Sequence, residues 1–190
     1  MRLWTIQHAS ILDNLKQRGV LRADGRHIDA GRRRAYEWMV TQLSKKIGPP
    51  PEGCAWPIWA WAHLPSEHGR SPHRARPDLR AAGHLPPGTP GVRIAFDAER
   101  DKVLLSCFDS WHAVLNDCYH SRSDQDYERH EALAAGKGQD APEVIKEKLE
   151  SWDRIFDLDL IPDKNSYAVQ AVLWEIPEEW IKSIEPFVAR

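Results

Sequence analysis

Residues 167–177, with the sequence YAVQAVLWEIP, give the clearest indication of a buried β-strand in this chain. Only two polar residues, Gln170 and Glu175, interrupt the apolar run, and Pro177 ends it. A short apolar run bounded by a breaker is typical of a strand inside a sheet. Strand alternation puts Gln170 and Val172 on one face and Glu175 on the other. We therefore predict a central strand at the edge of a cleft, with Gln170 facing a ligand.

The rest of the chain alternates between strand patterns and helix patterns. Strand-like segments are residues 3–8, 20–21, 56–61, 92–96 and 102–105. Apolar spacing of three and four residues predicts helices around residues 11–18, 36–47, 109–118 and 142–156. We expect 92–96 and 102–105 to form a hairpin, and 178–187 to end the chain as a turn or short helix. The length of 190 residues predicts one domain, residues 1–190.

The overall composition excludes several classes of protein. The net charge of −2 gives no basic field of the kind that binds nucleic acid without specificity. No apolar run is long enough for a membrane span, and the first residues lack a signal-peptide pattern. Three cysteines leave one unpaired in any disulfide scheme, which is typical of a reducing compartment. We expect a cytoplasmic protein with no membrane partner.

Residues 62–91 are rich in proline and glycine and are predicted to form a long loop. Loops of this length in compact domains are often functional. The loop carries Asp78, Arg80 and three further arginines, and guanidinium groups can grip phosphates, although an ordinary charged loop has the same composition. Four histidines also fall here, but their spacing is looser than that of zinc ligands. We expect no metal site.

Trp59 and Trp61 belong to the same predicted strand and share one face of it. Aromatic side chains on one strand face can line a ligand pocket. They can equally pack in the core, where aromatic residues of strands are common. Both interpretations remain open for these two tryptophans.

Both ends of the sequence resemble ADP-ribosyltransferases, specifically the DarT-type enzymes that modify DNA with NAD. The likeness rests on residues 3–8, on Ile11-Leu12-Asp13-Asn14-Leu15, on Gly19-Val20-Leu21 and on residues 170–177. It implies an α+β fold with a mixed, mostly antiparallel sheet of about five to seven strands, split around a cleft and flanked by helices. The segments Trp59-Ala60-Trp61 and Phe108–His112 are also similar to those of an uncharacterised family of small bacterial proteins.

The resemblance implies NAD as a substrate and a nucleic acid or protein as the acceptor, but key positions differ. Val172 stands where the family has its catalytic glutamate, Thr5 replaces its NAD-contacting histidine, and Ile11 replaces its asparagine. A glutamate in such a site stabilises the cationic ribose that forms as nicotinamide leaves, and valine cannot do this.

We expect other residues to replace these groups in the predicted cleft. The candidate catalytic residues are Gln170, Glu175 and Asp78, and the candidate cofactor-binding residues are Gln7, Trp59, Trp61 and Arg80. Arg80 would hold the pyrophosphate, and Glu175 or Asp78 would supply the acid. The leading hypothesis is an ADP-ribosyltransferase-like transferase. The alternatives are a non-catalytic module that binds a nucleotide or partner, and an RNA-processing enzyme that uses the basic loop.

Overall fold

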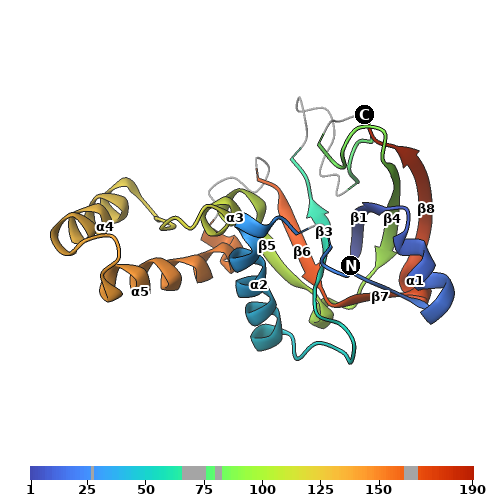
Figure 1. Cartoon of the computed structure of the whole chain (residues 1–190), viewed down its shortest axis with the longest axis horizontal. Helices are drawn as coiled ribbons and strands as arrows, with labels where there is room; N and C mark the ends of the chain where they lie inside the picture. The colour runs from blue at the N-terminus through green and yellow to red at the C-terminus, as the bar shows by residue number, and fades with distance from the viewer. Residues whose placement is uncertain (27, 66–75, 80–82, 161–166) are drawn as a thin grey trace.

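The computed structural model describes residues 1–26, 28–65, 76–79, 83–160 and 167–190. It contains a six-stranded sheet with the order β5-β6-β3-β1-β4-β8 and a two-stranded ribbon of β2 and β7 (Figure 1). The strands are β1 Arg2–His8, β2 Val20–Arg22, β3 Ile58–His63, β4 Pro90–Asp97, β5 Leu104–Cys107, β6 Val169–Leu173, β7 Glu175–Pro177 and β8 Ile181–Val188. Every ladder among the described strands is antiparallel. The prediction of an α+β fold with a mostly antiparallel sheet is confirmed.

Five α-helices accompany the sheet in the part of the chain that the structure describes. They are α1 Ile11–Arg18, α2 Arg33–Lys46, α3 Phe108–Leu115, α4 Asp124–Lys137 and α5 Pro142–Ser151. The 3-10 helix η4, Trp152–Phe156, continues directly from α5. Local chemistry explains the end of α1 and the approach to α2. Gly19 stops α1 with a φ of 66°, and Asp29 accepts a hydrogen bond from the amide of Gly31 as the N-cap of the 3-10 helix Ala30–Arg32, which leads into α2.

Three predictions of secondary structure need correction. The single strand expected over residues 167–177 is two strands, β6 and β7, which belong to different sheets. β4 and β5 do not form a hairpin, because both edges of β4 are already paired, with β1 and with β8, while β5 pairs with β6 at the far end of the sheet. The short helix expected over 178–187 is confined to the 3-10 helix Glu178–Trp180, and residues 181–188 form the edge strand β8. Pro186 is tolerated there because an edge strand has one side without ladder hydrogen bonds.

Apolar side chains pack on both faces of the sheet. On one face, Leu3, Ile94 and Leu173 belong to a core that α1, β2 and β7 cover. On the other face, α2, α3 and η4 cover Leu104 and Val172, which lie on β5 and β6. Thus the sheet forms the middle layer for part of its width.

The sheet is almost divided between β1 and β3. Only one residue pair, Trp4 with Trp61, joins these strands in register. The hydroxyl of Thr5 adds a side-chain hydrogen bond to the carbonyl of Trp59, at 2.6 Å. No further register pair joins β1 and β3 among the described residues, whereas β1 remains fully paired with β4 along residues 2–8. The two halves of the sheet are therefore β5-β6-β3 and β1-β4-β8.

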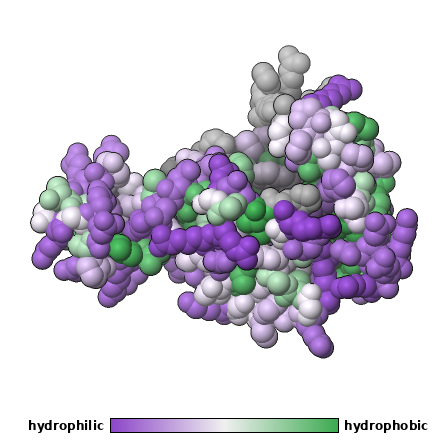
Figure 2. Space-filling model, in the orientation of Figure 1, coloured by the Kyte–Doolittle hydropathy of each residue, from purple (hydrophilic) through white to green (hydrophobic). Residues whose placement is uncertain are grey.

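Helices α4 and α5 project from the rest of the molecule as an arm (Figure 1). Figure 2 shows that this arm is covered mainly by hydrophilic side chains. At its base, the carboxylate of Asp126 accepts hydrogen bonds from the Tyr119 hydroxyl, the Arg122 amide and the guanidinium groups of Arg129 and Arg154. These donors hold the pKa of Asp126 well below its usual range, the Arg122 amide having the largest effect. The arm is thus anchored by a charged network rather than by a large apolar core.

Among the described residues, no helix combines the length and the apolar character that crossing a bilayer requires.

Candidate functional site

A cavity of about 680 Å³ lies where β1 and β3 separate. β1 contributes residues 6–8, and residues 56–59 line the opposite side. Helix α1, the loop after β2, Tyr36 of α2 and residues 85, 86 and 89 complete the walls. This volume falls within the range of about 300–1,000 Å³ that is usual for small-molecule sites. The gap in the sheet therefore holds the candidate site.

An aromatic wall closes one side of the cavity. Trp59 and Tyr36 make an edge-to-face contact with ring centroids 5.5 Å apart, and Trp111 packs against them at 5.0 and 5.9 Å. Burial raises the pKa of the Tyr36 hydroxyl, an effect that the nearby Arg32 partly opposes. The Tyr36 phenol is consequently a neutral hydrogen-bond donor at physiological pH.

Trp56 supports the loop that follows β2. Residue Gly25 has a φ of 75°, and a Cβ atom at this position would lie 2.4 Å from Nε1 of Trp56. Only glycine lets the backbone adopt this conformation and approach the indole so closely. The guanidinium of Arg33 lies 5.1 Å from the centre of the same ring. The indole thus fixes the loop after β2, residues 23–26, along one border of the cavity.

Amide side chains form the polar wall. Gln7 donates a hydrogen bond from Nε2 to the Thr5 hydroxyl at 2.7 Å, and Asn14 of α1 donates from Nδ2 to the carbonyl of Arg22 at 3.2 Å. Gln17 lines the same cavity. These groups carry no charge, so they are suited to the polar edge of a ring or an amide.

The charged groups along the cavity are balanced. Arg22 pairs with Glu175 at 2.7 Å and donates to the carbonyl of Glu52 at 2.8 Å. Arg26 lies beside Asp24 and hydrogen-bonds to its carboxylate at 2.6 Å. Asp13 is the second carboxylate that lines the cavity. Among the described residues that line the cavity, two arginines are therefore accompanied by two aspartates, and this part of the lining has no strong excess of either sign.

The structure brings together two of the predicted cofactor-binding residues, Gln7 and Trp59, both of which line the cavity. Trp61 does not line it; its ring packs edge-to-face on Phe108 of α3 at 4.9 Å. The two tryptophans of β3 thus have different roles: Trp59 lines the cavity, and Trp61 packs against α3.

Gln170 does not face the cavity. The side chain is 4% exposed and donates a hydrogen bond to the hydroxyl of Ser106 on β5 at 3.0 Å. Strand β3 lies between β1 and β6, so Gln7 and Gln170 do not share a hollow. The prediction that these glutamines meet at one ligand is wrong, because β6 pairs with β3 and β5 rather than with β1.

The predicted acids lie in different places. Glu175 is on β7 and is bound to Arg22, whose side chain stands at the cavity wall. Asp78 is exposed, and its backbone carbonyl lies 2.8 Å from Nε2 of His84. Arg80 lies outside the described residues. Val172 is fully buried beneath the helices, so this position offers no acid to a ligand.

Sequence reasoning missed the contributions of Tyr36, Trp56 and Asn14 to the cavity. Tyr36 follows the apolar spacing of α2 and was therefore assigned to the core face of that helix. Trp56 was assigned to a strand, yet it lies before β3, where it packs on Gly25. A glycine inside the polar segment after Leu21 was the available signal for a close backbone approach.

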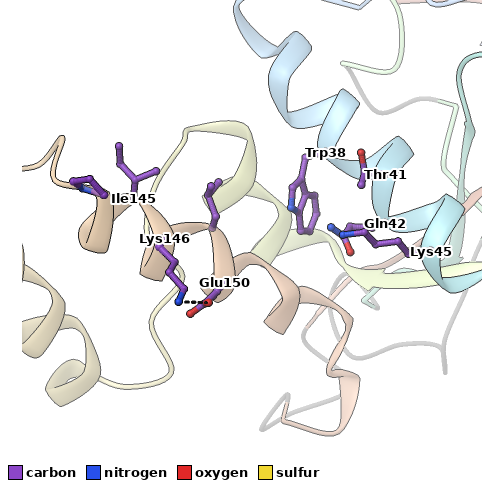
Figure 3. Close-up of a pocket in the computed structure, with 9 residues that line it drawn as sticks. Trp38, Thr41, Gln42, Lys45, Ile145, Lys146 and Glu150 are labelled. Carbon is purple, nitrogen blue, oxygen red and sulfur yellow. Dashed lines mark ion pairs between the residues drawn. The ribbon is translucent and has the colours of Figure 1, made fainter.

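A second hollow of about 680 Å³ is an open groove between α2 and α5 (Figure 3). Trp38 of α2 and Ile145 and Leu149 of α5 provide its apolar surface. The one ion pair drawn there, Lys146 with Glu150, is long at 3.8 Å and well exposed. This groove lacks the converging polar groups of the first cavity.

No group of three or more histidine, cysteine, aspartate or glutamate residues within the described ranges is arranged to hold a metal ion. Two of the four loop histidines, His68 and His73, lie outside those ranges.

The model of a family described as a domain of unknown function, DUF3841, matches residues 2–182. No curated protein matches the chain, and no solved structure matches it. Because the match to the family model spans almost the whole chain, the protein belongs to the DUF3841 family.

Proposed function

We propose that the cavity between β1 and β3 binds a dinucleotide of the NAD type and that the protein is ADP-ribosyltransferase-like. The observation that carries this proposal is the division of the sheet after a single residue pair, with a cavity of about 680 Å³ in the gap. A flat ligand can enter between two strands only where their ladder is missing. We further propose that the protein acts in the cytoplasm, where NAD is available.

The two walls suit the two kinds of surface that such a ligand has. Tyr36, Trp56 and Trp59 can stack against heterocyclic rings, and stacking on aromatic side chains contributes about 1–3 kcal/mol per base. Gln7 and Asn14 can pair with the polar edges of those rings. Arg26, at the exposed border, hydrogen-bonds to Asp24 through Nε, and its other guanidinium N–H groups can contact a pyrophosphate.

Calorimetry with NAD tests the binding proposal. Wild-type protein should bind NAD, and Trp56→Ala should weaken the affinity at least fivefold because a stacking surface is lost. Trp180→Ala is the control, since Trp180 is similarly half-buried but does not line the cavity. Absence of NAD binding to the wild-type protein, or equal losses in both variants, would contradict the proposal.

Transfer of ADP-ribose to a nucleic acid or protein is a second candidate function, and the position of Asp24 favours it. Asp24 lines the cavity at an exposed point that an acceptor can reach. A carboxylate there can stabilise the positive charge that develops on the ribose and accept a proton from the acceptor. Asp24 would then take the role of the catalytic glutamate that the resembled family has at the position of Val172.

Labelled NAD separates binding from transfer. Purified protein is incubated with labelled NAD and, in separate reactions, with DNA, RNA or a cell extract. Transfer that Asp24→Asn abolishes while NAD binding persists would establish an enzyme that uses this acid. Asp13→Asn is the matched control, because it removes the other carboxylate of the cavity. Binding without transfer or release of nicotinamide would leave a nucleotide-binding module.

A further inference from the structure

The orientation of the Gln7 carboxamide is fixed by a short chain of hydrogen bonds. Gln7 Nε2 donates to the Thr5 hydroxyl at 2.7 Å, and that hydroxyl donates to the backbone carbonyl of Trp59 at 2.6 Å. A carbonyl oxygen can only accept, and a threonine hydroxyl has a single proton. That proton is therefore committed to Trp59, and Gln7 must donate to the Thr5 oxygen. The amide nitrogen of Gln7 is thus defined by its partners.

Burial makes this arrangement rigid. Thr5 is completely buried, so no water competes for its hydroxyl. The acceptor belongs to β3 and the two side chains to β1, so the chain crosses the division of the sheet beside the single Trp4–Trp61 pair. Because Gln7 lines the cavity, its remaining groups, the Oε1 acceptor and the second N–H of Nε2, are those left to meet a ligand.

We propose that Gln7 determines specificity in this cavity by reading a ligand edge on which a hydrogen-bond donor stands next to an acceptor. A carboxamide side chain forms paired hydrogen bonds with such an edge, as glutamine does with adenine. The proposal rests on the proposed function, and within NAD two groups have this chemistry: the primary carboxamide of nicotinamide and the edge of adenine formed by its 6-amino group and N7. Thr5 is the positioning residue, since it does not touch the ligand and acts through Gln7.

The charge balance of the cavity supports a neutral edge as the feature that Gln7 reads. Asn14 is oriented in the same manner, because the Arg22 carbonyl can only accept from its Nδ2 atom. Two oriented amides therefore line a cavity in which Arg22 and Arg26 face Asp13 and Asp24. A carboxylate or keto group in place of the amide or amine would bring two acceptors together.

Two pairs of mononucleotides distinguish the two sources of this chemistry. Calorimetry compares nicotinamide mononucleotide with nicotinic acid mononucleotide, and AMP with IMP. If Gln7 reads the carboxamide, wild-type protein should prefer the first member of the nicotinamide pair by about tenfold, the size expected for hydrogen bonds left unmade in a buried site. If Gln7 reads adenine, the preference should fall on AMP over IMP instead.

Three variants test the assignment to Gln7 and Thr5. Gln7→Met keeps the length of the side chain and should reduce the observed preference to less than about threefold. Thr5→Val, which is isosteric but frees the carboxamide to rotate, should reduce it as well. Thr5→Ser retains the hydroxyl and should preserve the preference. A purely structural role for Thr5 would lower the affinities for both members of a pair equally.

The outcomes separate this inference from the function on which it rests. NAD binding by the wild-type protein without a preference in either pair, or a preference that survives in Gln7→Met, would overturn the role of Gln7 and leave the NAD site standing. Failure of the wild-type protein to bind NAD and all four mononucleotides would overturn both.

Discussion

The two ends of one sheet face are covered in different ways. At the β5-β6-β3 end, α2, α3 and η4 bury an apolar and aromatic core that contains Trp111, Trp152 and Val172. At the β1-β4-β8 end, charged side chains surround Trp4, whose ring has Arg76 and Arg93 at 5.6 and 5.9 Å. One end is held by burial and the other largely by ion pairs.

The charged end is organised around Arg93 of β4. Its side chain is only 6% exposed, and it donates to the carbonyl of Pro77 and to Glu185 of β8. Arg76 donates to both oxygens of Glu185, at 3.0 and 3.1 Å. These bonds hold residues 76–78 against the sheet. The cavity therefore lies between a half fixed by apolar packing and a half whose covering responds to pH and salt.

The largest expected effect concerns the apolar end. Trp152 is 1% exposed, packs edge-to-face on Trp38 and donates from Nε1 to the carbonyl of Cys118 at 2.7 Å. Trp152→Ala should lower the free energy of unfolding by about 3–5 kcal/mol, because a large cavity and an unpaired carbonyl remain. Urea unfolding measures this change. A loss no greater than that of Trp180→Ala would mean that burial does not dominate this end.

The next effect concerns the buried polar pair at the same end. Gln170→Ala should cost about 1–3 kcal/mol of unfolding free energy, since it leaves the fully buried Ser106 hydroxyl without its donor. NAD affinity, measured by calorimetry at a temperature where the variant is folded, should stay within about twofold of the wild-type value. Selective loss of NAD binding in a variant of normal stability would show that Gln170 reaches the ligand after all.

The smallest effect concerns the charged end and appears as a pH dependence. The hydrogen bond from Arg93 lowers the pKa of the Glu185 carboxyl, and this contribution is largest among its causes. The resulting stabilisation is present above the unfolded-state value of about 4.3 and is lost as the pH falls from there through the lower folded-state value. Glu185→Gln should lose less than about 1 kcal/mol at neutral pH, because Glu185 is 38% exposed.

Urea unfolding of the two proteins at a series of acidic pH values measures this dependence. The stability of wild-type protein should decline more steeply with acid than that of Glu185→Gln. If the free energy of unfolding of the two proteins declined in parallel with pH, the Glu185 carboxylate would make no contribution to the acid dependence of stability.

Local features were predictable from the sequence, whereas strand order was not. The apolar run at residues 167–177 correctly indicated a buried strand at Val169–Leu173, but not that Glu175–Pro177 is a separate strand of the small sheet. Gly19 ends α1, and its effect depends only on neighbours in the chain. The placement of β3 between β1 and β6 depends on contacts between distant segments, which a single sequence does not reveal. Because the strand order was not predicted, Gln170 was expected to contact a ligand, whereas it is buried and hydrogen-bonds to Ser106.

The candidate site was partly predictable for the same reason. Gln7 was identified as a polar group on the first strand that could replace the family's missing histidine, and Trp59 as an aromatic residue of a predicted strand; both line the cavity. The Arg22–Glu175 pair was not, since its members are 153 positions apart and meet only through the β2–β7 ribbon. Asn14 and Tyr36 lie on amphipathic helices whose periodicity indicates packing and gives no sign of a neighbouring cavity.

The single residue pair between β1 and β3 has a mechanical consequence. Antiparallel ladders resist bending between neighbouring strands through repeated hydrogen bonds. Between β1 and β3 the recorded links are the Trp4–Trp61 pair and the hydrogen bond from the Thr5 hydroxyl to the Trp59 carbonyl. We therefore expect the two halves of the sheet to bend relative to each other most easily between β1 and β3. A planar ligand bound there would contact both the indole of Trp59 and the amide of Gln7. It would therefore link β1 and β3, the two neighbouring strands with the fewest ladder pairs, and reduce their relative motion.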